Sequence, residues 1–218
     1  TVQNIEAMKI DAVVMRHPSP GSSLLLTKYI DSVVINAGDG THEHPTQAIL
    51  DMTSLKEQFG KINGLKIGII GDIAHSRVAR SNIYGLNKMG AEVMVCGPST
   101  LVPYEIESLG VKITHNLDEI LDWADAINVL RIQLERMDRG LFPSVREYRN
   151  LFGITDERLQ KHNKEIIIMH PGPMNRGVEI DSSVADGKSA IILDQVLNGV
   201  ASRMAILYLF LGGNQNES

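Results

Sequence analysis

The stretch Val33-Val-Ile-Asn-Ala-Gly-Asp-Gly-Thr-His-Glu-His-Pro-Thr-Gln47 decides the fold, because a strand end, a glycine loop and a helix start follow one another in it. The apolar run at 33–35 predicts a short buried strand, and Gly38 and Gly40 predict a tight loop behind it. Pro45 suits the first turn of a helix, where a missing backbone N–H costs nothing. Apolar residues then recur at helical spacing up to Gly60, which predicts the end of the helix.

His44 is predicted at the mouth of this helix, with Gln47 three residues further on the same face. Backbone N–H donors, the helix dipole, an imidazole and a carboxamide then converge where a small anion could bind. The plainer interpretation is that His44 only caps the helix and that Gln47 faces solvent. Other segments of the chain decide between the two interpretations.

Outward from this point, short apolar runs alternate with helical patterns as far as the strand at 165–169. This alternation predicts an α/β fold of two lobes, with parallel sheets flanked by helices and a larger lobe that is Rossmann-like. The polar, aperiodic segment 131–152 is predicted as a functional loop. The strongly apolar last helix, 196–211, is expected to pack against the first forty residues. The predicted lobes are therefore 1–44 with 195–212, and 45–194.

Composition narrows the class of protein. A net charge of −5 over 218 residues, without a block of Lys or Arg, argues against nucleic acid as a partner. The single cysteine, Cys96, lies in an apolar run and is predicted to be buried and inert, which fits a reducing cytoplasm. No apolar run has the length of a membrane span, and no signal peptide is recognisable. Thr1 opens on a helical pattern without a cap, so we expect an N-terminal part to precede it.

Polar residues follow each predicted strand, and in open α/β sheets ligands gather at these carboxyl ends. The set is Arg16, His44 with Gln47, Asp72 to Arg77, Arg131 with Gln133, and His170 to Pro173. Arginine suits bidentate binding of carboxylate or phosphate, so the substrates should be small and multiply anionic. Taken singly, Arg77 and Arg80 could be solvated, and His170 could merely satisfy backbone groups. Only their joint occurrence at consecutive strand ends favours a functional site.

Several chemistries lack their motifs. Gly68 and Gly71 do not form the G-x-G-x-x-G fingerprint of dinucleotide binding, and no Walker loop or G-x-S-x-G elbow is present. His42 and His44 alternate on a loop, an arrangement in which two side chains rarely share one metal ion. We therefore expect neither a cofactor nor a metal.

Four motifs together resemble those of aspartate carbamoyltransferase catalytic chains. They are His44-Pro-Thr-Gln47, Gly71-Asp-Ile-Ala-His-Ser-Arg77, Leu130-Arg-Ile-Gln-Leu-Glu-Arg136, and His170-Pro-Gly-Pro with Asn175-Arg-Gly-Val-Glu-Ile. The match runs in order from end to end of the chain. Related ornithine enzymes carry Cys where Thr46 stands, which favours aspartate as the second substrate.

The resemblance implies transfer of a carbamoyl group from carbamoyl phosphate to L-aspartate, the opening step of pyrimidine synthesis. It implies that Arg16 contacts the phosphate and the carbonyl oxygen and that His44 polarises this oxygen. Gln47 and the carbonyls of Gly172 and Pro173 would hold the carbamoyl NH₂. Arg77 and Arg131 would bind the carboxylates of aspartate, with Gln133 beside them. The loop after Arg131 would move as the lobes close.

The family's phosphate-binding Ser-Thr-Arg-Thr-Arg motif and the lysine loop given by a neighbouring subunit would both precede Thr1. We therefore expect the first lobe to be incomplete, and the chain by itself to bind aspartate weakly and to turn over little. The family also implies a homotrimer with shared active sites, with a regulatory chain or a dihydroorotase as a further partner. The alternatives are a non-catalytic scaffold of the same fold that assembles with another enzyme, and a nucleotide-dependent oxidoreductase, which rests on fold alone.

Overall fold

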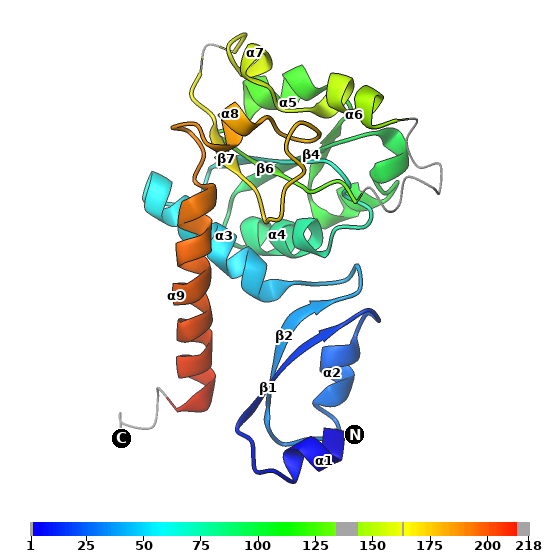
Figure 1. Ribbon diagram of the computed structural model, residues 1–218, viewed down its shortest axis with the longest axis vertical. Coiled ribbons are helices and arrows are strands. Elements are labelled where there is room, and N and C mark those ends of the chain that lie inside the picture. The colour runs from blue at the N-terminus through cyan, green and yellow to red at the C-terminus, as the bar shows by residue number, and fades with distance from the viewer. Residues whose placement is uncertain (1, 134–143, 163, 213–218) are drawn as a thin grey trace.

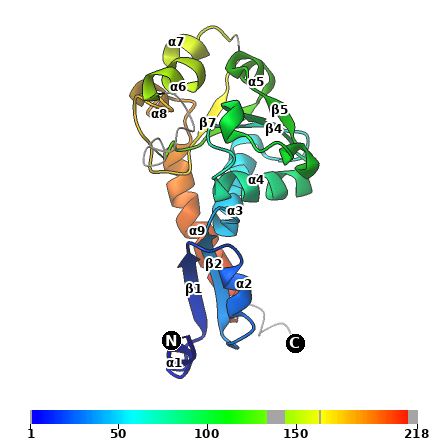
Figure 2. The same cartoon turned by 90° about the vertical axis from the view of Figure 1, so that its right-hand side faces the viewer.

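A computed structural model describes residues 2–133, 144–162 and 164–212, and two parallel sheets organise them (Figure 1). β1 (Ala12–His17) and β2 (Val33–Asp39) form a two-stranded sheet beside α1 (Val2–Glu6) and α2 (Ser22–Leu26). This small sheet lies below the main body in Figure 2. The second sheet has five strands in the order β5-β4-β3-β6-β7, all parallel.

The remaining elements follow in chain order. They are α3 (Pro45–Phe59), β3 (Lys66–Ile70), α4 (Arg77–Lys88), β4 (Glu92–Cys96), η1 (Ser99–Leu101), η2 (Ile106–Leu109), β5 (Lys112–Thr114), α5 (Leu117–Trp123), β6 (Ala126–Val129), α6 (Val145–Phe152), α7 (Asp156–Leu159), β7 (Ile167–Met169), α8 (Ser182–Ala185) and α9 (Ile192–Leu211).

Helices cover both faces of the larger sheet because its strands are apolar on both sides. Ile67 and Ile69 of β3 pack in one cluster with residues of α3 and α4, whereas Ile70 packs in a second cluster with residues of α5 and α6. Alternate side chains of a strand point to opposite faces, so a continuous apolar run buries both faces of a parallel sheet. The predicted α/β, Rossmann-like architecture is confirmed.

The chain reverses its direction of travel across the sheet between β3 and β6. It runs from β3 outward to β4 and β5, and then returns to β6 and β7 on the other side. At the carboxyl ends of β3 and β4 the backbones come close together. A Cβ on Gly97, after β4, would lie 2.4 Å from the carbonyl oxygen of Gly71, after β3. Ligand sites in open α/β sheets form at such a switch point, beside the carboxyl ends of the strands.

The prediction of a structureless segment over 131–152 is wrong in its second half. Residues 145–152 form α6, and residues 134–143 lie outside the described residues. The Ser144 side chain accepts a hydrogen bond from the Glu147 backbone N–H at 3.1 Å, and Tyr148 and Phe152 bury one face of the helix. Ser-Val-Arg-Glu147 is a capping-box pattern, so the helix signal was present in the sequence.

Replacing Ser144 with alanine is expected to lower the free energy of unfolding by about 1 kcal/mol. The reason is that the Glu147 N–H at the start of α6 loses its acceptor. Urea denaturation followed by circular dichroism measures the change. Ser183→Ala is the control, because the Ser183 side chain makes no hydrogen bond to the rest of the described chain. An equal loss in both variants would contradict the capping role.

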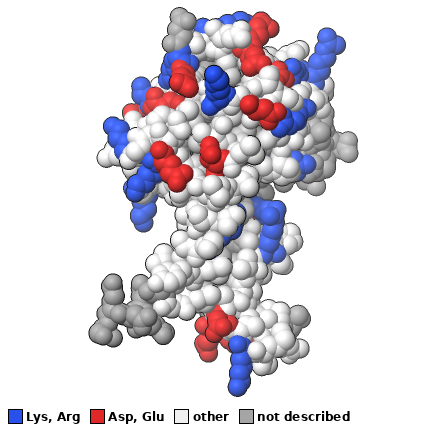
Figure 3. All heavy atoms as spheres, turned by 60° about the vertical axis from the view of Figure 1, so that its left-hand side comes forward, with Lys and Arg blue, Asp and Glu red and all other residues white. Residues whose placement is uncertain are grey.

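The last helix packs mainly along α3, and not along the first forty residues as predicted. Its end, from Leu209, borders the first forty residues across a cavity that both line. Gln195, Asn198 and Ser202 lie on its buried side, facing α3. Its other faces expose large apolar side chains, and the surface over α9 carries few charges (Figure 3). The exposed set is Leu193, Val196, Leu197, Val200, Met204 and Leu207 to Leu211. In the described part of the chain, no helix combines the length and apolarity needed to cross a bilayer.

Candidate active site

The junction between β2 and α3 fixes His44 and Gln47. His44 stands at the N-cap position of α3, but its side chain makes no capping hydrogen bond. Its backbone N–H instead donates to Ser81 Oγ of α4 at 2.8 Å. Gln47 is only 7% exposed and its Nε2 donates to Asp51. The plainer interpretation, a capping histidine and a solvated glutamine, is therefore wrong on both counts.

The buried carboxylate of Asp39 holds the loops on either side of this junction. It accepts hydrogen bonds from the backbone N–H groups of Gly21 at 2.7 Å and Glu43 at 3.0 Å, and from the Asn36 side chain at 3.2 Å. Burial tends to raise the pKa of Asp39, but hydrogen bonds led by that from Asn36 lower it overall. An ionised Asp39 thus ties the loop after β1, which follows Arg16, to the loop before His44.

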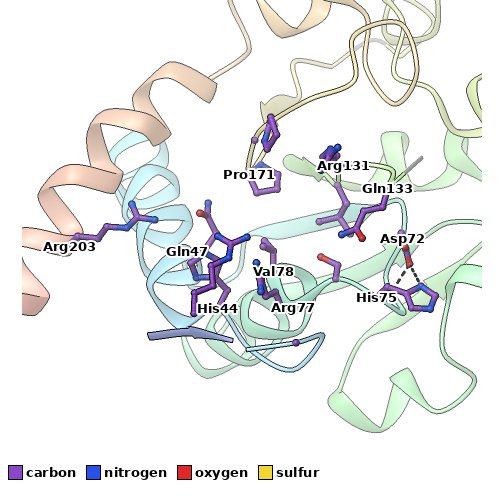
Figure 4. A pocket seen from close by; sticks show the side chains of 16 residues that line it. His44, Gln47, Asp72, His75, Arg77, Val78, Arg131, Gln133, Pro171 and Arg203 are labelled. Atoms are coloured by element: carbon purple, nitrogen blue, oxygen red, sulfur yellow. Dashed lines mark hydrogen bonds and ion pairs between the residues drawn. The ribbon is translucent and has the colours of Figure 1, made fainter. Parts of the chain in front are cut away.

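All the candidate substrate-binding residues named from the sequence line one cavity of about 470 Å³. They are Arg16, His44, Gln47, Arg77, Arg131, Gln133, Gly172 and Pro173. In Figure 4, His44, Gln47 and Arg77 approach from α3 and α4, Arg131 and Gln133 from the end of β6, and Pro171 from the loop after β7. The cavity therefore lies at the switch point of the larger sheet, where the two lobes meet.

Arg203 of α9 is a cavity residue that the sequence analysis missed (Figure 4). It is the only basic residue of α9, and a single cation on so apolar a helix was a usable signal. Asp72 and His75 also line the cavity, where the Asp72 carboxylate accepts from the His75 backbone N–H at 3.1 Å. This contact shapes the turn that precedes α4.

The cavity holds a positive charge that carboxylates do not neutralise. Within the described residues, none of the guanidinium groups of Arg16, Arg77, Arg131 and Arg203 lies within 4.0 Å of an acidic oxygen. Burial, and then the charge of Arg16, lowers the pKa of Arg77. A Cβ on Gly38 would lie 2.8 Å from the Arg77 guanidinium carbon, so this glycine makes room for the cation. Cations left close together without partners form a site for a multiply charged anion.

His44 is neutral at physiological pH. Burial, followed by the charges of Arg77, Arg16 and Arg203, lowers the pKa of His44 from 6.5 to about 4. A neutral imidazole has one N–H to donate and one nitrogen to accept. Thr46 Oγ1 lies 3.4 Å from His44 Nδ1, and a hydroxyl donating there would leave the ring proton on Nε2. His44 can then act as a hydrogen-bond donor across a wide range of pH.

We expect an NMR titration of the ligand-free protein to give His44 a midpoint near pH 4. Between pH 6.5 and 4 the unfolded chain would bind a proton at His44 that the folded chain does not bind, so the contribution of His44 to stability falls as the pH falls through this window. Arg203→Gln should raise the His44 pKa by removing one cation, whereas Arg149→Gln, outside the cavity, should leave it unchanged. A His44 midpoint near 6.5 in the unsubstituted protein would contradict this account.

Two residues considered in the sequence analysis, His170 and Arg80, lie outside the cavity lining. His170 is fully buried: its Nδ1 accepts from the Gly172 N–H at 2.9 Å and its Nε2 lies 3.3 Å from the buried carboxylate of Glu179. It does not line the cavity, but it shapes the loop that does. Arg80 is half-buried on α4 and does not line the cavity either. Cys96 is buried as predicted, and burial raises the pKa of its thiol to about 12.

Comparison with known families gives one result over most of the chain. The model for the carbamoyl-P binding domain of aspartate/ornithine carbamoyltransferases matches residues 1–57, and the model for the Asp/Orn binding domain matches residues 63–210. The aspartate carbamoyltransferase catalytic subunit of Gemmatimonas aurantiaca is 58% identical over 213 residues, which cover 98% of this chain and 67% of that relative. The catalytic subunit of Christiangramia forsetii is 60% identical over 209 residues, which cover 96% of this chain and 67% of that relative.

Solved structures agree with the sequence comparisons. The chain is similar to an aspartate transcarbamoylase from Trypanosoma cruzi in complex with carbamoyl phosphate, with a TM-score of 0.83 and 30% identity, over 95% of this chain and 69% of that one. An ornithine carbamoyltransferase from Pyrococcus furiosus also gives a TM-score of 0.83, at 25% identity, over 97% of this chain and 70% of that one. The resemblance that the four motifs suggested is confirmed.

Proposed function

Because the chain belongs to the aspartate/ornithine carbamoyltransferase family, we propose that its cavity transfers the carbamoyl group of carbamoyl phosphate to the amine of L-aspartate. The products are N-carbamoyl-L-aspartate and phosphate, in the first committed step of pyrimidine synthesis. The observation that carries this proposal is the convergence in one cavity of a neutral histidine and four guanidinium groups that form no ion pair with a described carboxylate. A phosphate and a dicarboxylate need several cations, and a carbonyl under attack needs a donor for its developing charge.

In this proposal, Arg16, His44 and Gln47 bind and polarise the carbamoyl group. His44 donates its N–H to the carbonyl oxygen and stabilises the negative charge that develops there in the tetrahedral transition state. Arg16 contacts the same oxygen and the phosphate, and Arg203 adds positive charge from α9. Gln47 and the carbonyls of Gly172 and Pro173 accept hydrogen bonds from the carbamoyl NH₂. These three acceptors distinguish the NH₂ from the carbonyl oxygen.

L-Aspartate is bound by Arg77, Arg131 and Gln133. Two guanidinium groups match two carboxylates, and the same charges would repel the cationic side chain of ornithine. The relatives from Gemmatimonas aurantiaca, Halothermothrix orenii and Christiangramia forsetii, at 56–60% identity, are aspartate carbamoyltransferase catalytic subunits, which supports the same choice. We retain as part of the proposal that residues 45–194 form the aspartate lobe, and that 1–44 with 195–212 belong to the carbamoyl phosphate lobe.

Holding the amine against the carbonyl supplies much of the rate acceleration. The aspartate amine must lose a proton, and the departing phosphate is the acceptor we favour. The proposal invokes neither a covalent intermediate nor a metal or cofactor. The scaffold alternative is disfavoured, because a scaffold has no use for four arginines gathered in one cavity.

Product identity tests the proposal. Incubating the chain with carbamoyl phosphate and L-aspartate is expected to yield N-carbamoyl-L-aspartate, which mass spectrometry detects even at low turnover. L-Ornithine in place of L-aspartate is expected to yield no carbamoylated product. A preference for ornithine would overturn the choice of substrate.

We also propose that the protein acts in the cytoplasm as a homotrimer with shared active sites, as the resemblance implies. The apolar side chains exposed on α9 support burial by a further chain. The proposal includes a regulatory chain or a dihydroorotase as an additional partner, and it involves neither nucleic acid nor a membrane. Sedimentation equilibrium would give the mass of the assembly: three times 24.0 kDa is expected, and a monomer would contradict the proposal.

A further inference from the structure

A buried carboxylate lies directly behind the cavity and receives only amide donors. Asp51 is 1% exposed and stands on α3, one turn after Gln47. Its Oδ1 accepts from Gln47 Nε2 at 3.0 Å and Gln195 Nε2 at 2.7 Å. Its Oδ2 accepts from Asn82 Nδ2 at 2.7 Å and Asn128 Nδ2 at 3.1 Å. The four donors come from α3, α9, α4 and β6, and each is itself buried.

A carboxylate can only accept hydrogen bonds, so each of these amides must turn its NH₂ group toward Asp51. Burial raises the pKa of Asp51 overall, although the four amide donors lower it in part. Within the described part of the chain, the hydrogen bonds that Asp51 receives all come from amide N–H groups, an arrangement that suits the ionised form. The orientation of every amide around it is therefore determined by a single group.

This orientation has a consequence inside the cavity. With Nε2 of Gln47 held by Asp51, the remaining polar atom of its carboxamide is Oε1, and Gln47 lines the cavity. Gln195 is turned in the same sense, and its Oε1 accepts from the His170 backbone N–H at 2.9 Å. The same carboxylate thus orients a cavity amide and, through Gln195, the start of the loop that carries Gly172 and Pro173.

We infer that Asp51 is a positioning residue that keeps the oxygen of Gln47 toward the substrate, and that it thereby makes the cavity selective for a carbamoyl NH₂ over an acyl methyl group. The inference rests on the proposed function, because it concerns the same carbamoyl phosphate. A carboxamide turned the other way would place its own N–H donors against the substrate NH₂. Donor would then face donor, and the hydrogen bond that recognises the carbamoyl group would be lost.

Asp51→Asn tests this inference, because asparagine keeps the shape but can present an NH₂ group to Gln47 and so allow it to turn. Calorimetry compares the binding of carbamoyl phosphate with that of acetyl phosphate, in which a methyl group replaces the NH₂. The variant is expected to bind carbamoyl phosphate about 3- to 10-fold more weakly, as for one lost hydrogen bond, and to bind acetyl phosphate within about twofold of the unsubstituted protein. Ser54→Ala, a buried change on α3 that does not touch Gln47, is the control and should leave both affinities unchanged.

Equal weakening of both ligands in Asp51→Asn would show a purely structural role and overturn the inference. Unsubstituted protein that binds neither ligand would overturn the proposed function, and the inference with it. If Asp51→Asn does not fold, a neutron structure of the unsubstituted protein decides the matter. Two deuterons on the Gln47 atom nearest Asp51 are expected, and a bare oxygen there would refute the inference.

Discussion

Replacing His44 with alanine is expected to lower kcat for carbamoyl transfer by about 10²–10³-fold, the usual cost of removing one donor to a developing oxyanion. The side chain caps nothing, so its loss should leave the fold intact. The pKa of His44 is held near 4, so the imidazole is neutral and its donor role should not titrate between pH 6 and 8. The rate ratio between the two proteins should therefore be constant over this range.

The ¹³C shift of bound carbamoyl phosphate reports the same interaction without turnover. The hydrogen bond proposed from His44 would polarise the carbonyl, so its ¹³C resonance should lie further downfield in the unsubstituted protein than in His44→Ala. His42→Ala is the matched control, because His42 lies on the same loop but does not line the cavity. An unchanged ¹³C shift and an unchanged kcat in His44→Ala would remove His44 from the mechanism.

Arg131→Gln is expected to weaken the binding of L-aspartate by about 10- to 100-fold, the cost of losing charge-assisted hydrogen bonds to one carboxylate. Its effect on carbamoyl phosphate should be small, because Arg131 comes from the end of β6, whereas the proposed function places the carbamoyl group beside His44. The KM for each substrate, measured with the other saturating, separates the two effects.

Arg80→Gln is the matched control for Arg131→Gln. It removes a half-buried arginine of α4 that does not line the cavity, so both KM values should stay the same. If Arg80→Gln raised the KM for aspartate as much as Arg131→Gln does, the effect would come from the overall charge of the protein. The assignment of Arg131 to a substrate carboxylate would then fail.

The larger sheet and the location of the cavity could be predicted because both depend on local patterns. The apolar strands, Pro45 at the start of α3 and Gly60 at its end placed His44 and Gln47 correctly. Residues that follow parallel strands meet at one edge, and so Arg16, Arg77 and Arg131 could be placed together before any coordinates. The direction of the parallel strands is enough to predict that these residues lie at the same edge of the sheet.

Contacts between segments distant in sequence could not be predicted in this way. Nothing local to Asp51 shows that it receives amides from Asn128 and Gln195, which lie far along the chain. Arg203 reaches the cavity only because α9 packs along α3, and the helix was expected to pack elsewhere. The α6 helix is different, since Ser144 and Glu147 carried a capping signal that the polar composition of the segment obscured.

The central claim is that one cavity binds a phosphate and an aspartate at the same time, and N-(phosphonacetyl)-L-aspartate joins both groups in a single molecule. Isothermal titration calorimetry with this compound tests the claim most directly. We predict one binding site per chain in the unsubstituted protein, weakened at least tenfold by Arg131→Gln and unchanged by Arg80→Gln. A folded protein that releases no heat, or that binds the compound equally well without Arg131, would contradict the account.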